Sequence, residues 1–240
     1  KTGPNDFNRI TVHISKGRAF ILVNGHRMCD AIEIPHQGPP RGISLGIACT
    51  DPNIRVEYDR IAVRAIDPAT AAEIASAPVA SPLPPGPKLG DTIYEDDFSN
   101  PETGWNREDM KMGAGLAPFL RDYDAEKGLY FLEAPESWQG AEAWDCTGPL
   151  DGDFQINLTG RVVGAGNSPG GWGVVIAGPG GRGFQVGIDR ESKIAIDPAF
   201  WGVEKFPNDP HYLPPMSHPV IKPATEWNKI AVRVRKRELR

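Results

Sequence analysis

The sequence predicts an all-β protein, an antiparallel two-sheet β-sandwich whose halves stand in split or permuted order. Glycine and proline supply 27 and 24 of the 240 residues, well above the roughly 12% of an average chain, which indicates many turns and few long helices. Short segments with apolar residues at every second position recur along the chain, as in half-buried strands. Residues 7–14 also resemble residues 227–234, so the two ends carry copies of one strand.

Composition and charge exclude several classes of partner. The chain holds 26 basic and 31 acidic residues, and its net charge of -5 gives no general attraction for nucleic acid. No apolar run approaches the roughly 20 residues that span a bilayer, so we expect no membrane insertion. The start, Lys1-Thr2-Gly3-Pro4, is neither an initiator methionine nor a signal peptide, which predicts a processed piece.

Residues 1–67 read as a series of short strands. Ile10, Val12 and Ile14 alternate with polar residues, and the run 19–23 ends at Asn24-Gly25, a dipeptide suited to a tight hairpin turn. Alternation resumes over 43–47 and again over 54–63. We interpret this segment as the C-terminal half of a sandwich unit.

Residues 68–90 lose this alternation and become rich in alanine and proline, with prolines at 78, 82, 84, 85 and 87. Such a composition is typical of a semi-rigid extended linker. Strand patterns return over 92–98, 130–133, 154–158, 172–176, 184–188 and 194–196. We interpret residues 91–240 as the N-terminal part of a sandwich unit.

The terminal repeat determines how these parts can combine. Phe7-Asn8-Arg9-Ile10 matches Trp227-Asn228-Lys229-Ile230, and the apolar alternation continues in phase through both copies. A few strands with one apolar face cannot shield a core alone, so residues 1–67 need a partner. Either the linker joins the strand of Val63 to that of Tyr94 within one chain, or copies exchange strands into a dimer or filament. The sequence leaves both possibilities open.

The order of these motifs resembles bacterial concanavalin A-like domains. The matching motifs are Glu95-Asp96-Asp97-Phe98-Ser99, Gly104-Trp105, Trp227-Asn228-x-Ile230, Val23-Asn24-Gly25 and Val56-Glu57-Tyr58-Asp59-x-Ile61. This group includes laminin-G-like modules, sugar-binding appendages and 3-keto-disaccharide hydrolases. The resemblance implies a jelly roll found at the cell surface or outside the cell, often binding glycans. The split order of the halves departs from the usual pattern.

Two groups of residues are candidates for binding carbohydrate. The stretch 198–223 lacks alternation and holds aromatic and polar side chains among several prolines; its candidates are Trp201, Phe206, Asn208, Asp209, His211 and Tyr212. Trp138 and Trp144 form a second candidate group. Flat rings suit the apolar face of a sugar, and amides and acids suit its hydroxyl groups. The alternative is that the tryptophans cap the sandwich core.

The sequence offers fewer candidates for metal binding and catalysis than for carbohydrate binding. Asp96, Asp97 and Asp59, on strands expected to be neighbours, could give calcium hard oxygen ligands, although turn capping is the alternative. The Glu-x-Asp-x-x-Glu pattern of glucanases of this fold fails, because Asn100 or Ala62 stands where the last carboxylate belongs. Gly178–Gly183 fits a dinucleotide fingerprint, but the alternation that follows predicts a hairpin turn.

These observations predict a non-catalytic module of an extracellular or surface protein that binds carbohydrate or another envelope component. Two alternatives remain at this stage. The first is a structural repeat unit that assembles by strand exchange. The second is an enzyme of the 3-keto-disaccharide hydrolase type, which family resemblance alone suggests. We assign no catalytic residue from the sequence.

Overall fold

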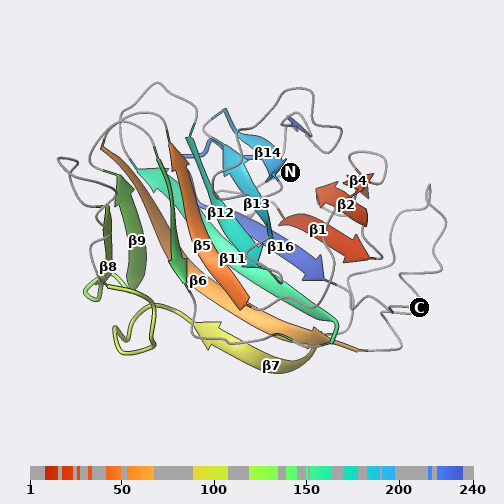
Figure 1. The fold of residues 1–240 in the computed structure, drawn as a ribbon, viewed down its shortest axis with the longest axis horizontal. Helices are drawn as coiled ribbons and strands as arrows, with labels where there is room; N and C mark the ends of the chain where they lie inside the picture. Colours follow the sequence, from red (N-terminus) through yellow and green to blue (C-terminus); the bar gives the residue numbers. More distant parts are fainter. Residues whose placement is uncertain are drawn as a thin grey trace.

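The computed structural model describes residues 9–15, 18–23, 26–27, 32–33, 42–49, 53–67, 89–107, 119–134, 139–144, 150, 152–163, 170–177, 183–189, 191–197, 216–217 and 221–234. Within these ranges the regular elements are strands, which form two sheets (Figure 1). Among the same residues, no helix has the length and apolar character needed to cross a membrane.

The first sheet contains ten of the described strands. They are β1 (Arg9–Ser15), β2 (Arg18–Val23), β3 (His26–Arg27), β4 (Ile32–Glu33), β6 (Ile54–Ile66), β7 (Leu89–Asp96), β8 (Leu120–Asp124), β9 (Leu129–Ala134), β11 (Phe154–Val163) and β16 (Asn228–Val234). The order along the sheet is β3-β2-β1-β16-β11-β6-β9-β8, with β4 against β2 and β7 against β6. The long strand β6 pairs with β9 through its first half and with β7 through its second half.

The second sheet contains six described strands. They are β5 (Gly42–Cys49), β10 (Gln139–Trp144), β12 (Gly170–Ala177), β13 (Gly183–Asp189), β14 (Lys193–Asp197) and β15 (Met216–Ser217), in the order β10-β5-β12-β13-β14-β15. In Figure 1 the strands β5, β12 and β13 lie across those of β6, β11 and β16. The expected hairpin turns are confirmed, because Val23 pairs with His26 and Ala177 pairs with Gly183.

The core lies between the two sheets. Apolar side chains at every second position of both sheets form one buried cluster, including Ile43, Leu45 and Ile47 of β5, Val174 and Ile176 of β12, Ile156 and Leu158 of β11, and Ile230 and Val232 of β16. The ring of Tyr58 on β6 meets that of Trp172 on β12 edge to face, with centroids 6.1 Å apart. The prediction of an all-β sandwich of two antiparallel sheets is therefore confirmed, whereas the finer jelly-roll assignment stays a prediction.

In both sheets, a strand from residues 42–66 lies between strands from residues 89–234. In the first sheet β6 lies between β11 on one side and β7 and β9 on the other, and in the second sheet β5 lies between β10 and β12. Val63 pairs with Tyr94 and Ile66 with Leu89, so the strands on either side of the predicted linker are neighbours, as expected. Residues 42–66 thus supply inner strands to sheets built largely from residues 89–234.

The two copies of the repeated strand also lie side by side. Strand β1 pairs with β16 in parallel, Ile10 opposite Ile230 and Val12 opposite Val232, in the same alignment that relates their sequences. Every other described strand pairing is antiparallel. β16 pairs with β11 on one side, and β1 lies against its other edge.

Candidate functional site

The predicted carbohydrate-binding residues belong to segments attached to the six-stranded sheet. Trp144 ends β10 and pairs with Ser44 of β5. Trp138, which directly precedes β10, and the group 201–212 lie outside the described residues. The stretch 198–215 connects β14 with β15, which pair through Ile194 and Met216. Both groups are therefore tethered to this sheet, one at β10 and one at β14 and β15.

Between these tethers, one row across the sheet consists largely of glycine. Gly46 of β5 pairs with Gly173 of β12, which pairs in turn with Gly187 of β13. The row continues to Ala195 of β14 at one end and to Glu142 of β10 at the other. We call Gly46, Gly173 and Gly187 the glycine strip. Their neighbours Leu45, Val174 and Val186 are core residues, so the strip belongs to the face directed away from the other sheet.

Close approach of β12 and β13 explains two of these glycines. A Cβ atom at Gly173 would lie 2.1 Å from the carbonyl oxygen of Val186, and one at Gly187 would lie 2.3 Å from that of Trp172. Gly46 is less restricted, because its Cβ would meet side-chain atoms of Val175 at 3.2 Å and Gln185 at 3.6 Å. Backbone packing thus excludes side chains at Gly173 and Gly187, and all three glycines of the strip are buried.

Polar groups flank the glycine strip. Gln185 and Asp189 of β13 lie on either side of Gly187 on the same face, and both are partly exposed. The Asp189 carboxylate accepts a hydrogen bond from the Lys193 amide at 2.8 Å, and burial raises its pKa. Beside the buried strip, Gln185 and Asp189 thus present an amide and a carboxylate, groups that can bind the hydroxyl groups of a sugar.

The three predicted metal ligands have different environments. Tyr58 pairs with Gly160 and Arg60 with Thr159, so Asp59 is the extra residue of a β-bulge and its side chain is exposed. The carboxylate of Asp96 is buried and accepts hydrogen bonds from the Phe98 amide at 2.7 Å and from the Tyr94 hydroxyl at 3.2 Å. The bulge at Asp59 is visible in the sequence, because Tyr58 and Ile61 are both buried although they are three positions apart rather than two or four.

Asp97 is bonded within the turn that follows β7, next to Asp96. Its carboxylate accepts hydrogen bonds from the hydroxyl of Ser99 at 2.6 Å and from the amide of Ser99 at 3.1 Å, and these bonds lower its pKa. Phe98 between the two aspartates has φ of 58°, a left-handed conformation that costs a residue with a side chain about 1–2 kcal/mol. Burial of its ring between Trp105 and Tyr130 offsets that cost. The Asp-Asp-Phe-Ser motif therefore has a structural role.

In the described part of the chain, no three His, Cys, Asp or Glu side chains are grouped so that they could hold a metal ion. Asp96 and Asp97 act as turn caps, which the sequence offered as the alternative to calcium binding. A calcium ion bound with help from other residues stays a prediction.

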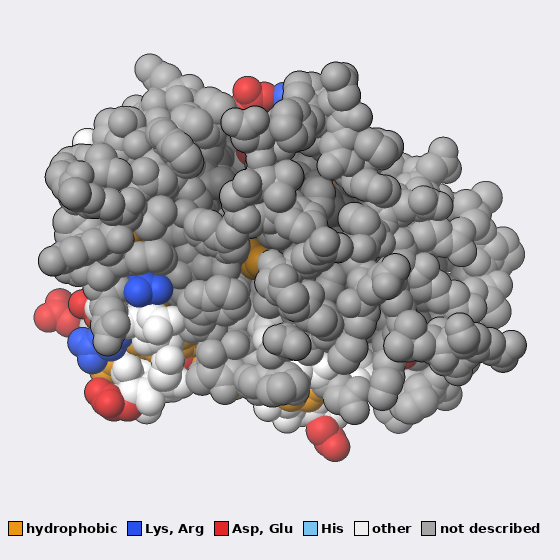
Figure 2. Space-filling view, viewed as in Figure 1, with side chains coloured by type: hydrophobic (Ala, Val, Ile, Leu, Met, Phe, Trp, Pro, Cys, Tyr) orange, Lys and Arg blue, Asp and Glu red, His pale blue; other side chains and the backbone are white. Residues whose placement is uncertain are grey.

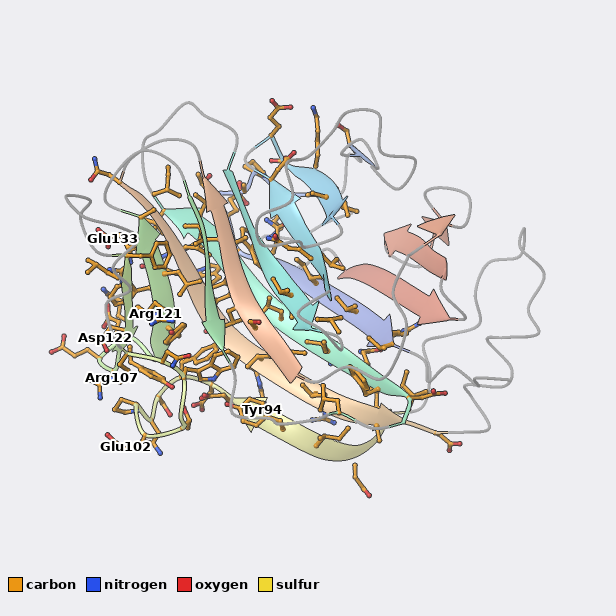
Figure 3. The ribbon with its side chains drawn as sticks, viewed as in Figure 1. Tyr94, Glu102, Arg107, Arg121, Asp122 and Glu133 are labelled. Atoms are coloured by element: carbon orange, nitrogen blue, oxygen red, sulfur yellow. The ribbon has the colours of Figure 1, made fainter. Side chains whose placement is uncertain are left out.

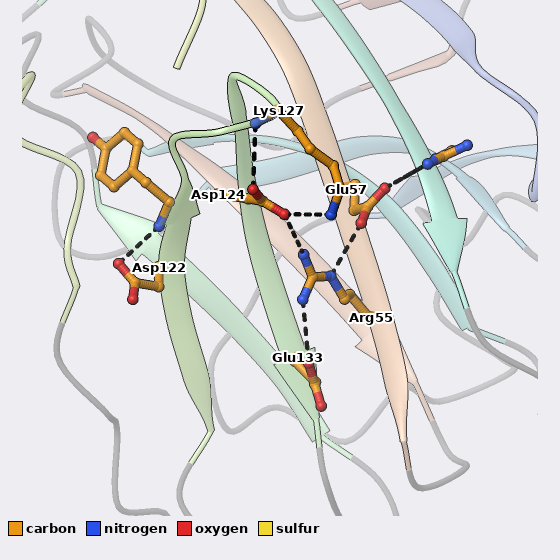
Figure 4. Close-up of polar contacts among 8 residues, drawn as sticks. Arg55, Glu57, Asp122, Asp124, Lys127 and Glu133 are labelled. Atoms are coloured by element: carbon orange, nitrogen blue, oxygen red, sulfur yellow. Dashed lines mark hydrogen bonds and ion pairs between the residues drawn. The ribbon is translucent and has the colours of Figure 1, made fainter. Parts of the chain in front are cut away.

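The sequence did not single out a cluster of charged residues that surrounds Glu57 on the outer face of the ten-stranded sheet (Figure 4). Both carboxylate oxygens of Glu57 are bonded, Oε1 by Arg55 Nε at 3.2 Å and Oε2 by Arg161 Nε and Nη2 at 3.0 and 2.8 Å. Glu133 and Asp124 lie 3.8 and 3.9 Å from the Arg55 guanidinium, and Lys127 lowers the pKa of Asp124 through a side-chain hydrogen bond.

Aromatic rings complete this cluster. The Arg55 guanidinium lies 3.8 Å above the ring of Phe131, and that of Arg161 lies 4.5 Å from the ring of Trp227. Glu57 is almost completely buried, with 7% of its side chain exposed. Arginines hold both of its oxygens, and the cluster thereby connects β6, β9 and β11.

A second group of charges lies at the β8–β9 end of the same sheet. Figure 2 shows acidic and basic side chains close together at the lower left, and Figure 3 places Arg107, Asp122 and Glu102 in this region. Arg107 Nε lies 3.0 Å from Asp122 Oδ1 and its Nη1 lies 3.9 Å from Glu102 Oε1. These groups are exposed, so their pairing adds little stability, and they form a solvated rim.

Comparison with known proteins adds no assignment. No protein-family model matches the chain, and neither does any curated protein.

Proposed function

We propose that this chain is a non-catalytic carbohydrate-binding module of an extracellular or surface protein, and that it binds a sugar beside the glycine strip of the six-stranded sheet, at the partly exposed Gln185 and Asp189. The observation that carries the proposal is the run Gly46, Gly173, Gly187 across three neighbouring strands, between the two tethers of the predicted aromatic residues. The glycines carry no side chains but are themselves buried. The partly exposed Gln185 and Asp189 beside them offer an amide and a carboxylate to the hydroxyl groups of a sugar, and the aromatic residues predicted from the sequence would supply stacking.

Five of the described carboxylates are engaged in structural contacts. Glu57, Glu133 and Asp124 are engaged by Arg55 or Arg161, and Asp96 and Asp97 cap a turn. Glycoside hydrolysis requires two carboxyl groups that face one ligand. The proposal accordingly contains no reaction step.

A glycan array followed by calorimetric titration of the best ligand tests this function. We expect Trp144→Ala, Gln185→Ala and Gly46→Ala each to weaken binding at least about fivefold, equivalent to about 1 kcal/mol. Gly46→Ala is informative because its new methyl group would contact side chains rather than backbone, so the sheet is retained. Lys229→Ala, an exposed position on the other sheet, is the matched control and should bind normally.

Two results would contradict the proposal. The first is the absence of binding to any glycan by a chain that circular dichroism shows to be folded. The second is a glycan whose affinity is unchanged by all three substitutions, which would move the site away from the glycine strip.

A further inference from the structure

Strands β1 to β4 form a separate arm of the ten-stranded sheet. β2 pairs with β1, β3 and β4, and only β1 pairs with a strand outside this group, namely β16, among the pairings of described residues. In Figure 1 the strands β1, β2 and β4 lie together at the right, away from β8 and β9. One ladder therefore carries the strand pairing between the arm and the rest of the sandwich.

That ladder joins two copies of one sequence. From Arg9 opposite Lys229 to Ile14 opposite Val234, each residue of β1 faces its counterpart in the repeat, and three of the six pairs are aliphatic on aliphatic. The facing edge of β16 is the same on every copy of the chain. A second molecule thus offers the arm the same register and the same apolar pairs as its own β16.

The connection between β4 and β5 is long enough for the arm to reach a second molecule. Glu33 ends β4 and Gly42 begins β5, and the nine residue steps between them can span up to about 30 Å when extended. Exchange of the arm between two copies keeps every ladder pairing and breaks none. It therefore costs little beyond the entropy of association, which is the usual condition for exchange of an identical element.

We propose that the arm, residues 9–33, is an exchangeable element that docks on β16 of a second copy of this chain. The partner is a second copy because another molecule of this chain presents the same β16 edge, with the same pairing register, to the arm. The interface is the β1–β16 ladder, formed between molecules instead of within one.

Cysteine pairs across this ladder test the proposal. Thr11 and Ala231 are direct partners, and neighbouring strands lie about 4.8 Å apart, within the Cα separation of about 4.4–6.8 Å that a disulfide spans. In a background carrying Cys29→Ser, Cys49→Ser and Cys146→Ser, one chain receives Thr11→Cys and another receives Ala231→Cys. The two are mixed in denaturant, refolded together at high concentration and oxidised.

The proposal predicts a disulfide between the two different chains, identified by peptide mass mapping. The double variant, with both cysteines in one chain and refolded at high dilution, is the positive control and should form the bond internally. A Thr11→Cys chain mixed with a Lys229→Cys chain is the register control and should give a lower yield, because diagonal neighbours are farther apart.

Either of two outcomes would overturn the proposal. If the double variant closes its bond and the mixed single variants do not, the arm does not exchange; if neither bond forms, the β1–β16 ladder itself is absent. Light scattering on the unmodified chain gives a second measurement that needs no substitution. We expect a species of twice 26.1 kDa that grows with the concentration at refolding, and a particle of 26.1 kDa at every concentration would contradict the exchange.

Discussion

Tyr58 shows how one side chain joins the two sheets. It stands on β6 in the ten-stranded sheet, is fully buried, and donates its hydroxyl proton to the carbonyl of Gly46 in the other sheet at 2.7 Å. The carbonyl of Gly173 lies 3.4 Å from the same hydroxyl. Burial raises the pKa of this phenol far above its usual range, so the hydroxyl remains a donor at every pH the protein meets.

Tyr58→Phe keeps the packing against Trp172 and removes only this hydroxyl. We expect a loss of about 1–2 kcal/mol in the free energy of unfolding, because a buried carbonyl loses its side-chain donor. Urea unfolding monitored by tryptophan fluorescence measures the change, with an unaltered m-value as evidence that the fold is kept. A variant as stable as the parent protein would show that this bond does not contribute to holding the sheets together.

Asn228 gives a physical reason for the asparagine in the repeated strand motif. Its side-chain oxygen accepts the Lys222 amide at 3.2 Å, and its Nδ2 donates to the carbonyls of Pro223 and Glu226 at 3.2 and 3.0 Å. The residue is completely buried and fixes the turn that leads into β16. A short sequence match reveals the asparagine but not these backbone partners.

Asn228→Ala should lower the free energy of unfolding by about 2–3 kcal/mol, since buried backbone groups lose their partners. Asn228→Asp keeps an acceptor for Lys222 but places oxygen against two carbonyls, so we expect a loss at least as large. Lys229→Ala, at the exposed neighbouring position, is the control for substitution in this strand. Chemical denaturation of the three variants checks this order, and a fully stable Asn228→Ala protein would contradict it.

The raised pKa of Asp189 leads us to expect that the free energy of unfolding depends on pH. Burial raises its pKa, so the folded chain binds the proton more tightly than the unfolded chain. The contribution of this carboxyl group to stability therefore falls as pH rises from the ordinary aspartate value, about 3.9, through the raised value. Asp189→Asn keeps an acceptor for Lys193 and should gain stability relative to the parent protein between pH 3.5 and pH 7. Urea titrations at both pH values test this, and a difference that shrinks with pH would contradict it.

At the scale of elements, β12 and β13 pack so closely that glycine is required. Gly187→Ala would place a methyl group 2.3 Å from the carbonyl oxygen of Trp172, so we expect a loss of about 2–4 kcal/mol from forced backbone movement. Gly46→Ala, in the same row, should cost far less because flexible side chains can move aside. Thermal unfolding of the two variants compares them directly, and equal losses would mean that strand spacing does not set the glycine strip.

The sequence predicted the strands whose inward residues are branched and whose ends carry turn residues. β5, β11, β12 and β13 follow strict alternation, and β6 shows its bulge as a change of phase between Tyr58 and Ile61. The sequence patterns did not predict β8 or β10. Leu120–Asp124 is only five residues long, and Gln139–Trp144 contains no β-branched residue, so their strand conformation depends on pairing with β9 and β5.

The candidate site was less predictable for a related reason. Aromatic composition pointed to residues 201–212 and to Trp138 and Trp144. The sheet order shows that Trp144 and the strands that flank the stretch 198–215 belong to one sheet. The glycine strip requires knowledge of register, because Gly46, Gly173 and Gly187 lie far apart in the sequence. The Glu57 cluster likewise joins residues more than a hundred positions apart, such as Glu57 and Arg161.

At the scale of the whole molecule, the sandwich depends on strands from both ends of the chain. β6 contributes Val56, Tyr58, Ile61 and Val63 to the core, and β11 faces it along ten paired positions. The segment between Ile66 and Leu89 connects β6 with β7, two strands that pair with each other in the same sheet. Its covalent continuity is therefore not needed for the two sides to remain together.

Cleavage of this connection tests the complementarity of residues 42–66 and 89–234 most directly. A specific protease site replaces Ala77–Pro82, and the purified chain is cut and passed over a size-exclusion column without denaturant. The interleaved sheets predict that both fragments elute together and unfold in one transition at a lower midpoint than the uncut chain. Separation into two fragments that each keep a cooperative fold would contradict the account.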